Sequence, residues 1–149
     1  MIRAALLATV LLAGCGDCRC APRASDLDAR VDYRGETFHG QVHVDADGCV
    51  GSLQLWRGVG DDQLDMCDRL EIGLGPCTSS EDDAGARTVE PAAGEPPGTL
   101  ARTICETTPA SVWLDLSSYS LTLSPDGVIA GELRVEGGAV AVLEGEYWE

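Results

Sequence analysis

The chain has 149 residues, enough for one domain, and its 25 acidic residues outnumber 10 basic ones to give a formal net charge of −15 at pH 7. Such an acidic chain excludes nucleic acid as a partner, because nucleic-acid binders present a basic face to the phosphates. All of the basic residues are Arg, which excludes catalysis through a Lys Schiff base or a Lys acid–base pair.

The start of the chain has the pattern of an export signal. Arg3 supplies a positive charge, and an uncharged apolar segment from Ala4 to Ala13 follows it. About 10 apolar residues are too few for a permanent transmembrane helix, which needs roughly 20, but they suit a secretory signal helix. The segment ends in the motif Leu12-Ala13-Gly14-Cys15.

This motif resembles the lipobox of bacterial lipoproteins, and the resemblance covers residues 1–15 only. It implies that residues 1–14 are a cleaved signal peptide and that Cys15, the first mature residue, carries a diacylglycerol on its thiol. Gly16, rather than Asp, follows Cys15, which by analogy with enterobacterial lipoproteins favours the outer membrane. The alternative is an ordinary secretory signal or a short N-terminal helix, with Cys15 as a disulfide partner.

Polar residues with mixed charge then predict a tether over residues 15–30.

The cysteine count agrees with a lipidated Cys15. There are 7 cysteines, and an odd number in an exported protein leaves one thiol to explain. Lipidation of Cys15 leaves an even set, which predicts three disulfides in an oxidising compartment. The close pair Cys18 and Cys20 lacks zinc-finger spacing. A disulfide between these two would be strained, so we expect each to bond into the domain and hold it near the membrane. We favour Cys67 pairing with Cys77 across a short Gly- and Pro-containing loop. The predicted disulfide cysteines are Cys18, Cys20, Cys49, Cys67, Cys77 and Cys105.

Alternating apolar and polar residues predict strands along most of the mature chain. In the N-terminal half, residues 37–45 and 50–56 form a predicted hairpin around the Asp47-Gly48 turn, after an earlier turn at Arg34-Gly35. In the C-terminal half, strands are predicted over residues 100–105, 111–116, 119–123, 128–135 and 139–148, with a turn at Ser124-Pro125-Asp126-Gly127.

Two segments interrupt this pattern. Residues 58–77 fit either a short helix with Leu64, Cys67 and Leu70 on one side or a strand over residues 69–74, and the pattern does not choose between them. Residues 78–98 are rich in Asp, Glu, Ser and Pro, which predicts an exposed, solvated acidic loop.

The predicted fold class is therefore all-β. We expect residues 31–149 to form a single disulfide-stabilised domain, a small antiparallel sandwich or open barrel built as a hairpin meander of about six to eight strands.

No motif predicts catalysis, and no cofactor is expected. A Gly-x-Ser-x-Gly motif and a Gly-rich phosphate loop are both missing from the sequence. His39 and His43 are four residues apart, about 13 Å on a strand, which is too far to share a metal. Asp45-Ala46-Asp47-Gly48 resembles the start of a calcium loop, but Cys49 and Trp56 occupy later ligand positions, which favours a turn.

The tryptophans Trp56, Trp113 and Trp148 each lie on the polar register of a predicted strand. They are candidates for an aromatic binding surface or for a second packed layer. Two functions follow as hypotheses. The first is a non-enzymatic structural or protein-interaction module, anchored by its lipid in the bacterial cell envelope with a possible envelope protein as partner. The second is a small-ligand binder for sugar or calcium.

Overall fold

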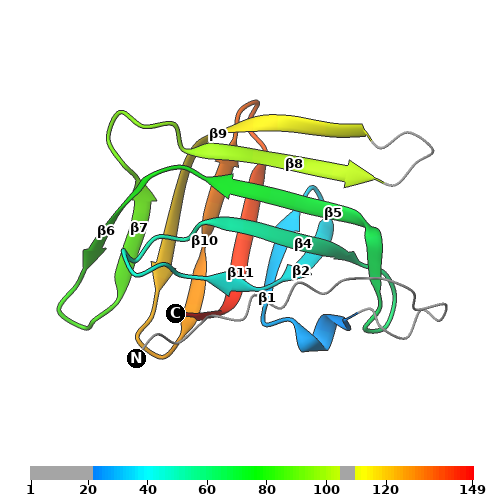
Figure 1. Cartoon of the computed structure of the whole chain (residues 1–149), viewed down its shortest axis with the longest axis horizontal. Coiled ribbons are helices and arrows are strands. Elements are labelled where there is room, and N and C mark those ends of the chain that lie inside the picture. The colour runs from blue at the N-terminus through cyan, green and yellow to red at the C-terminus, as the bar shows by residue number, and fades with distance from the viewer. Residues whose placement is uncertain (1–21, 105–109) are drawn as a thin grey trace, which may run out of the picture.

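The protein is described by a computed structural model, which covers residues 22–104 and 110–149 (Figure 1). Its described residues form strands joined by short turns, with one 3-10 turn, η2 (Ala24–Asp26), before them. The strands are β1 (Ala29–Tyr33), β2 (Glu36–Gly40), β3 (Val42–His43), β4 (Ser52–Gly58), β5 (Leu64–Leu74), β6 (Cys77–Glu81), β7 (Arg87–Pro91), β8 (Gly98–Ile104), β9 (Ala110–Leu123), β10 (Val128–Val135) and β11 (Val140–Trp148). The all-β prediction is confirmed.

The strands close into a barrel. Around it, the order is β1, β2, β4, β5, β8, β9, β10 and β11, and β11 pairs with β1 to complete the circle. All of these neighbours are antiparallel, so the barrel is a meander with a β6–β7 hairpin inserted between β5 and β8. In Figure 1, β4, β5 and β8 run across the view, whereas β10 and β11 run up and down it. Of the predicted alternatives, a sandwich or an open barrel, the structure shows a barrel, and this barrel is closed because β9 pairs with β10 and β11 pairs with β1.

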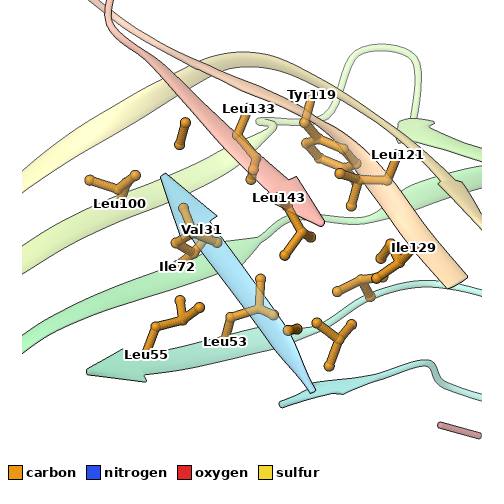
Figure 2. Packing of buried hydrophobic residues seen from close by; sticks show 14 of the residues in the cluster. Val31, Leu53, Leu55, Ile72, Leu100, Tyr119, Leu121, Ile129, Leu133 and Leu143 are labelled. Atoms are coloured by element: carbon orange, nitrogen blue, oxygen red, sulfur yellow. The ribbon is translucent and has the colours of Figure 1, made fainter. Parts of the chain in front are cut away.

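Side chains that alternate along each strand fill the inside of the barrel. Val31, Leu53 and Leu143 are buried from different strands, and Figure 2 shows them pointing toward one another. On β10, Ile129, Leu133 and Val135 are buried, whereas the alternate residues Val128, Ala130, Glu132 and Arg134 are exposed, as the sequence pattern predicts. Interior positions are therefore occupied by the protein's own aliphatic side chains.

Two predicted turns are present, and each places a Gly where the backbone has positive φ. Arg34 and Gly35 both have positive φ, 50° and 79°, as a two-residue hairpin requires. At Asp47-Gly48, the Gly48 N–H donates to the Asp45 carbonyl at 2.8 Å, and Gly48 has φ 77°. The predicted hairpin over residues 37–56 is present, but its first strand is interrupted at Gln41, and β3 then pairs in parallel with β11.

Residues 58–77, which the sequence left between helix and strand, contain the long strand β5. Its C-terminal half pairs with β4 and β8, and Leu70 and Ile72 point into the core. Period-two burial from Asp68 onward explains why the helical spacing of Leu64, Cys67 and Leu70 is not used.

The prediction of an acidic loop over residues 78–98 is wrong. This segment contains most of β6 and all of β7, a hairpin that pairs with the end of β9 through Val89 and Leu121. Val89 is fully buried, so this segment contributes an apolar side chain to the core, and the Cys49–Cys77 disulfide also ties the hairpin to the barrel. The Asp82 carboxylate accepts the N–H groups of Ala84 and Ala86, so an acidic residue of this segment organises a tight turn.

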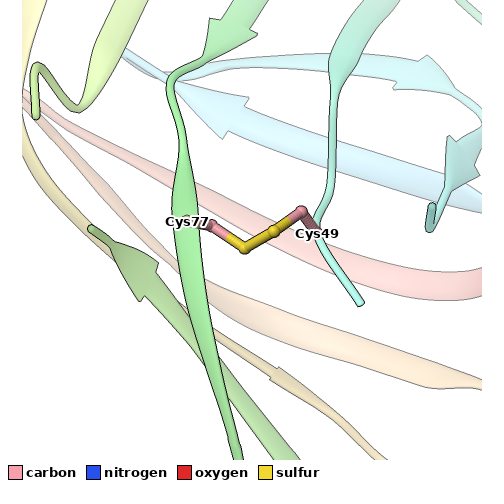
Figure 3. Close-up of a disulfide and its surroundings, with 2 residues drawn as sticks. All are labelled: Cys49 and Cys77. Carbon is pink, nitrogen blue, oxygen red and sulfur yellow. A yellow bond between two sulfur atoms is a disulfide. The ribbon is translucent and has the colours of Figure 1, made fainter. Parts of the chain in front are cut away.

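The favoured pairing of Cys67 with Cys77 is also wrong. Cys77, at the start of β6, is bonded to Cys49, just before β4, with a Cα–Cα distance of 5.9 Å (Figure 3). Cys67 lies exposed on β5. Its short sequence separation from Cys77 favoured the wrong pair, because the fold brings Cys49 next to Cys77. The predicted disulfides of Cys18, Cys20 and Cys105 lie outside the described residues.

The strands differ from the sequence prediction in further details. The predicted strands 111–116 and 119–123 form one strand, β9, with a bulge where Ser117 donates its hydroxyl to the Arg134 carbonyl at 3.2 Å. On β11, Ala141 and Leu143 are buried, whereas Val142 is 39% exposed. β1 begins within the predicted tether, at Ala29.

Candidate functional site

The most polar part of the barrel interior lies at one end, where β4 and β8 end and β5 and β9 begin. We call it the β4–β5 end. Five charged side chains meet here and form what we call the ion-pair cluster, which consists of Glu36, Arg57, Asp65, Asp68 and Arg102. They come from β2, β4, β5 and β8, which are consecutive neighbours in the sheet, so strand pairing brings them together.

Asp68 is the centre of the ion-pair cluster. Its side chain is only 5% exposed, and it contacts two guanidinium groups: Arg57 Nε lies 2.8 Å from Asp68 Oδ2, and Arg102 Nη2 lies 2.9 Å from the same oxygen. Arg102 Nε also donates to Asp68 Oδ1 at 3.2 Å, which makes this contact bidentate. Glu36 then binds both Arg57 and Arg102 from β2. Such pairing is what a buried carboxylate needs to stay charged.

A bulge in β5 places Asp68 at the centre. Trp56 pairs with Arg69, but the next residue of β4, Arg57, pairs with Asp65, so three residues of β5 oppose no residue of β4. Asp65 Oδ1 accepts the N–H of Cys67 at 2.9 Å and that of Asp68 at 3.2 Å, which closes the bulge. The Cys67 N–H, with the Asp68 N–H and Arg57, lowers the pKa of Asp65 against the opposing effect of burial.

The electrostatics of the ion-pair cluster favour the charged form of Arg102. The hydrogen bond to Asp68 raises the pKa of Arg102, with Glu36 adding to it, and the Arg102 guanidinium also lies 5.8 Å from the centre of the Phe38 ring. Each carboxylate is engaged by an Arg. The ion-pair cluster is suited to covering the apolar core with charge at this end.

Sequence reasoning missed the ion-pair cluster, although a signal was present. Arg57 and Arg102 lie on the same registers as the buried Leu55 and Leu100, two residues away in each case. A charged residue that continues an apolar face near the end of a strand indicates a buried or half-buried ion pair.

Two buried tyrosines are a second polar feature of the interior. Tyr33 on β1 and Tyr119 on β9 lie in one row of the sheet, connected through Ala141 and Leu133 on the strands between them. Each is 3% exposed, and neither hydroxyl has a hydrogen-bond partner among the described residues. Burial raises the pKa of Tyr119. These hydroxyls are places where a water molecule would be stabilised.

The structure does not gather the three candidate tryptophans into one surface. Through paired strands, Trp56 is connected to Arg69, Thr103 and then Ser111, so three strand spacings, roughly 14 Å, separate Trp56 from β9 and Trp113. Trp148 lies at the opposite end of the barrel, where its ring centre is 4.3 Å from that of His43. All three do lie on outward registers, as predicted: Trp56 is half-buried, Trp113 is 58% exposed and Trp148 is 55% exposed.

The histidines lie apart in their surroundings as well as in sequence. His43 is exposed, with Nδ1 3.5 Å from Asp45 Oδ1, while the half-buried His39 pairs with Trp56. Burial and the neighbouring Arg30 lower the pKa of His39. Across residues 22–104 and 110–149, no three His, Cys, Asp or Glu side chains are grouped as a metal site would require.

The lipobox and the predicted lipidation site, Cys15, lie outside the described residues. Within the part of the chain that is described, no helix is both long and apolar enough to cross a membrane. In comparisons with known proteins, no family model, no curated protein and no solved structure matches this chain.

Proposed function

We propose that this protein is a lipid-anchored lipoprotein of the bacterial cell envelope, held in the outer membrane, whose barrel is a non-enzymatic structural or protein-interaction module. The observation that carries the anchor is the Leu12-Ala13-Gly14-Cys15 motif, which follows a short apolar segment with Arg3 before it. The disulfide between Cys49 and Cys77 supports an oxidising compartment outside the cytoplasm.

The packing of the barrel supports an interaction module over a ligand carrier. An eight-stranded barrel is just wide enough for its own side chains to fill it, or for one small ligand to replace some of them. Here the large aliphatic residues Leu53, Leu70 and Leu143 occupy the interior. The sugar- or calcium-binding alternative draws little support from the separated tryptophans.

The anchor is tested by replacing the predicted lipidated residue. In cells that express the Cys15→Ser variant, we expect the signal peptide to remain, the acyl mass to be lost from the N-terminus and the protein to leave the detergent phase. The matched control is Cys18→Ser, which removes a neighbouring thiol. An acylated, processed N-terminus in Cys15→Ser would show that the lipobox assignment is wrong.

The module is tested by photo-crosslinking in intact cells, followed by detergent extraction of the envelope and mass spectrometry. A reproducible adduct with an envelope protein is expected. Calorimetric titration with Ca²⁺ and a panel of glycans tests the alternative. Saturable binding of one of these, without a protein adduct, would replace the interaction module by a ligand-binding function.

A further inference from the structure

We propose that the β4–β5 end of the barrel rests on the lipid bilayer and inserts an apolar patch into its interface. The patch consists of Met66, Ile104, Val112 and Trp113. This inference rests on the proposed lipid anchor and adds to it the face of the domain that meets the membrane.

The apolar patch is exposed and lies at one end of the molecule. Val112 is 61% exposed, Trp113 58%, Ile104 41% and Met66 37%, and they form the majority of the large exposed apolar side chains among the described residues. Val112 pairs with Arg102, which makes Ile104 its diagonal neighbour on the adjacent strand. Figure 1 shows the end of β8 and the start of β9 on the same side as the β4–β5 loop.

The strands leave the core at this end, which explains the exposure. On β8 and β9, Leu100 pairs with Leu114, and both contact the core; the next pair along the same face is Arg102 with Val112. Consecutive residues of a strand point to opposite faces, yet Val112 and Trp113 are both exposed. The beginning of β9 therefore presents apolar side chains on both faces and has no core to cover either.

The segment that follows the proposed anchor contacts the β4–β5 loop before it enters β1 beside the end of β11. The Ser25 N–H donates to Asp62 Oδ1 at 2.6 Å, and the Ser25 hydroxyl donates to Asp62 Oδ2 at 2.8 Å. Asp62 belongs to the β4–β5 loop, a few residues before Met66. The chain from Cys15 to Pro22 spans at most about 25 Å when fully extended, at roughly 3.3–3.6 Å per residue. The acyl chains would thus keep the β4–β5 end close to the bilayer.

A bilayer is the occupant that this chemistry fits. A Trp beside aliphatic side chains is typical of residues that lie at the membrane–water interface. A second contact beside the lipid adds affinity and would fix the orientation of the barrel. Because the chain has a net charge of −15, we expect insertion to be stronger into zwitterionic lipid than into anionic lipid.

The experiment measures how deeply two matched tryptophans lie. The lipidated protein is extracted from membranes and reconstituted into phosphatidylcholine vesicles that contain brominated acyl chains, which quench nearby tryptophans. One variant carries Trp56→Phe with Trp148→Phe and keeps Trp113; the other carries Trp56→Phe with Trp113→Phe and keeps Trp148. The retained tryptophans are similarly exposed, 58% and 55%, but lie at opposite ends of the barrel. A cooperative thermal melt confirms that each variant is folded.

We expect brominated lipid to quench Trp113 strongly and shift its emission to the blue, while Trp148 keeps its intensity. The shift at Trp113 should weaken in vesicles with anionic lipid. Equal or no quenching of the two tryptophans in acylated protein would overturn the membrane-facing assignment and leave the anchor intact. Protein without an acyl mass on Cys15 would refute the proposed anchor, whatever the fluorescence. Protection of Trp113 only in crosslinked dimers or with a protein partner would replace the bilayer by that partner.

Discussion

Arg102 and Asp68 form a bidentate ion pair inside the barrel, although they are 34 residues apart in sequence. Arg102 Nη2 lies 2.9 Å from Asp68 Oδ2 and Arg102 Nε lies 3.2 Å from Asp68 Oδ1. Because Arg57 contacts the same carboxylate, one buried negative charge holds two guanidinium groups at the end of the core.

Replacing Asp68 with Ala should therefore destabilise the fold. The change leaves two half-buried guanidinium groups without their shared partner, and we expect a loss of roughly 2–4 kcal/mol. Urea unfolding followed by circular dichroism measures it. Glu132→Ala is the control, because its contact with Arg134 is exposed and such pairs contribute about 0–1 kcal/mol. Equal effects of the two changes would contradict a special role for Asp68.

Stability should fall in mild acid because of His39. Burial and Arg30 lower its pKa below the ordinary 6.5, so the unfolded chain takes up a proton more readily than the folded one. The stability is thus full above pH 6.5 and declines as the pH falls from there toward the folded pKa. In His39→Gln, the pH dependence of the unfolding free energy in this window should be smaller. A pH dependence as large in His39→Gln as in the unaltered protein would refute the assignment.

The disulfide between Cys49 and Cys77 should contribute about 2–4 kcal/mol, because it limits the unfolded chain across a sequence separation of 28 residues. The double variant Cys49→Ala with Cys77→Ala, which leaves no odd thiol from this pair, tests this by urea unfolding. A midpoint equal to that of the unaltered protein would show that the bond is not formed.

Thiol titration of the denatured, unreduced mature protein tests the wider prediction of three disulfides. We expect a value near zero. One or more equivalents of free thiol would contradict it, and peptide mass mapping then identifies the cysteine concerned.

Shortening the region of residues 81–98 should be harmful where it removes β7. Val89 is fully buried against β9, so Val89→Ala should cost about 1–3 kcal/mol, while Glu90→Ala on the exposed side should cost little. Thermal melts of the two variants measure the difference. Similar melting temperatures would indicate that the β6–β7 hairpin does not pack on the barrel in solution.

The features that could be predicted from the sequence are local ones. Alternation over residues 128–135 predicts β10 with its boundaries and its buried face, because strand periodicity is set by neighbouring residues. The turns at Arg34-Gly35 and Asp47-Gly48 are likewise predictable, since Gly35 and Gly48 favour the positive φ that they adopt.

Features that depend on contacts between distant segments could be found only in the tertiary structure. The acidic segment over residues 78–98 contains a hairpin whose Val89 pairs with Leu121 of β9. Cys77 bonds to Cys49 because the order of the strands brings the two residues together. Asp68 becomes the centre of an ion-pair cluster only when a bulge in β5 turns it toward Arg57 and Arg102. In each case the contact joins segments that are far apart in sequence, and periodicity along one strand carries no information about which strand lies beside it.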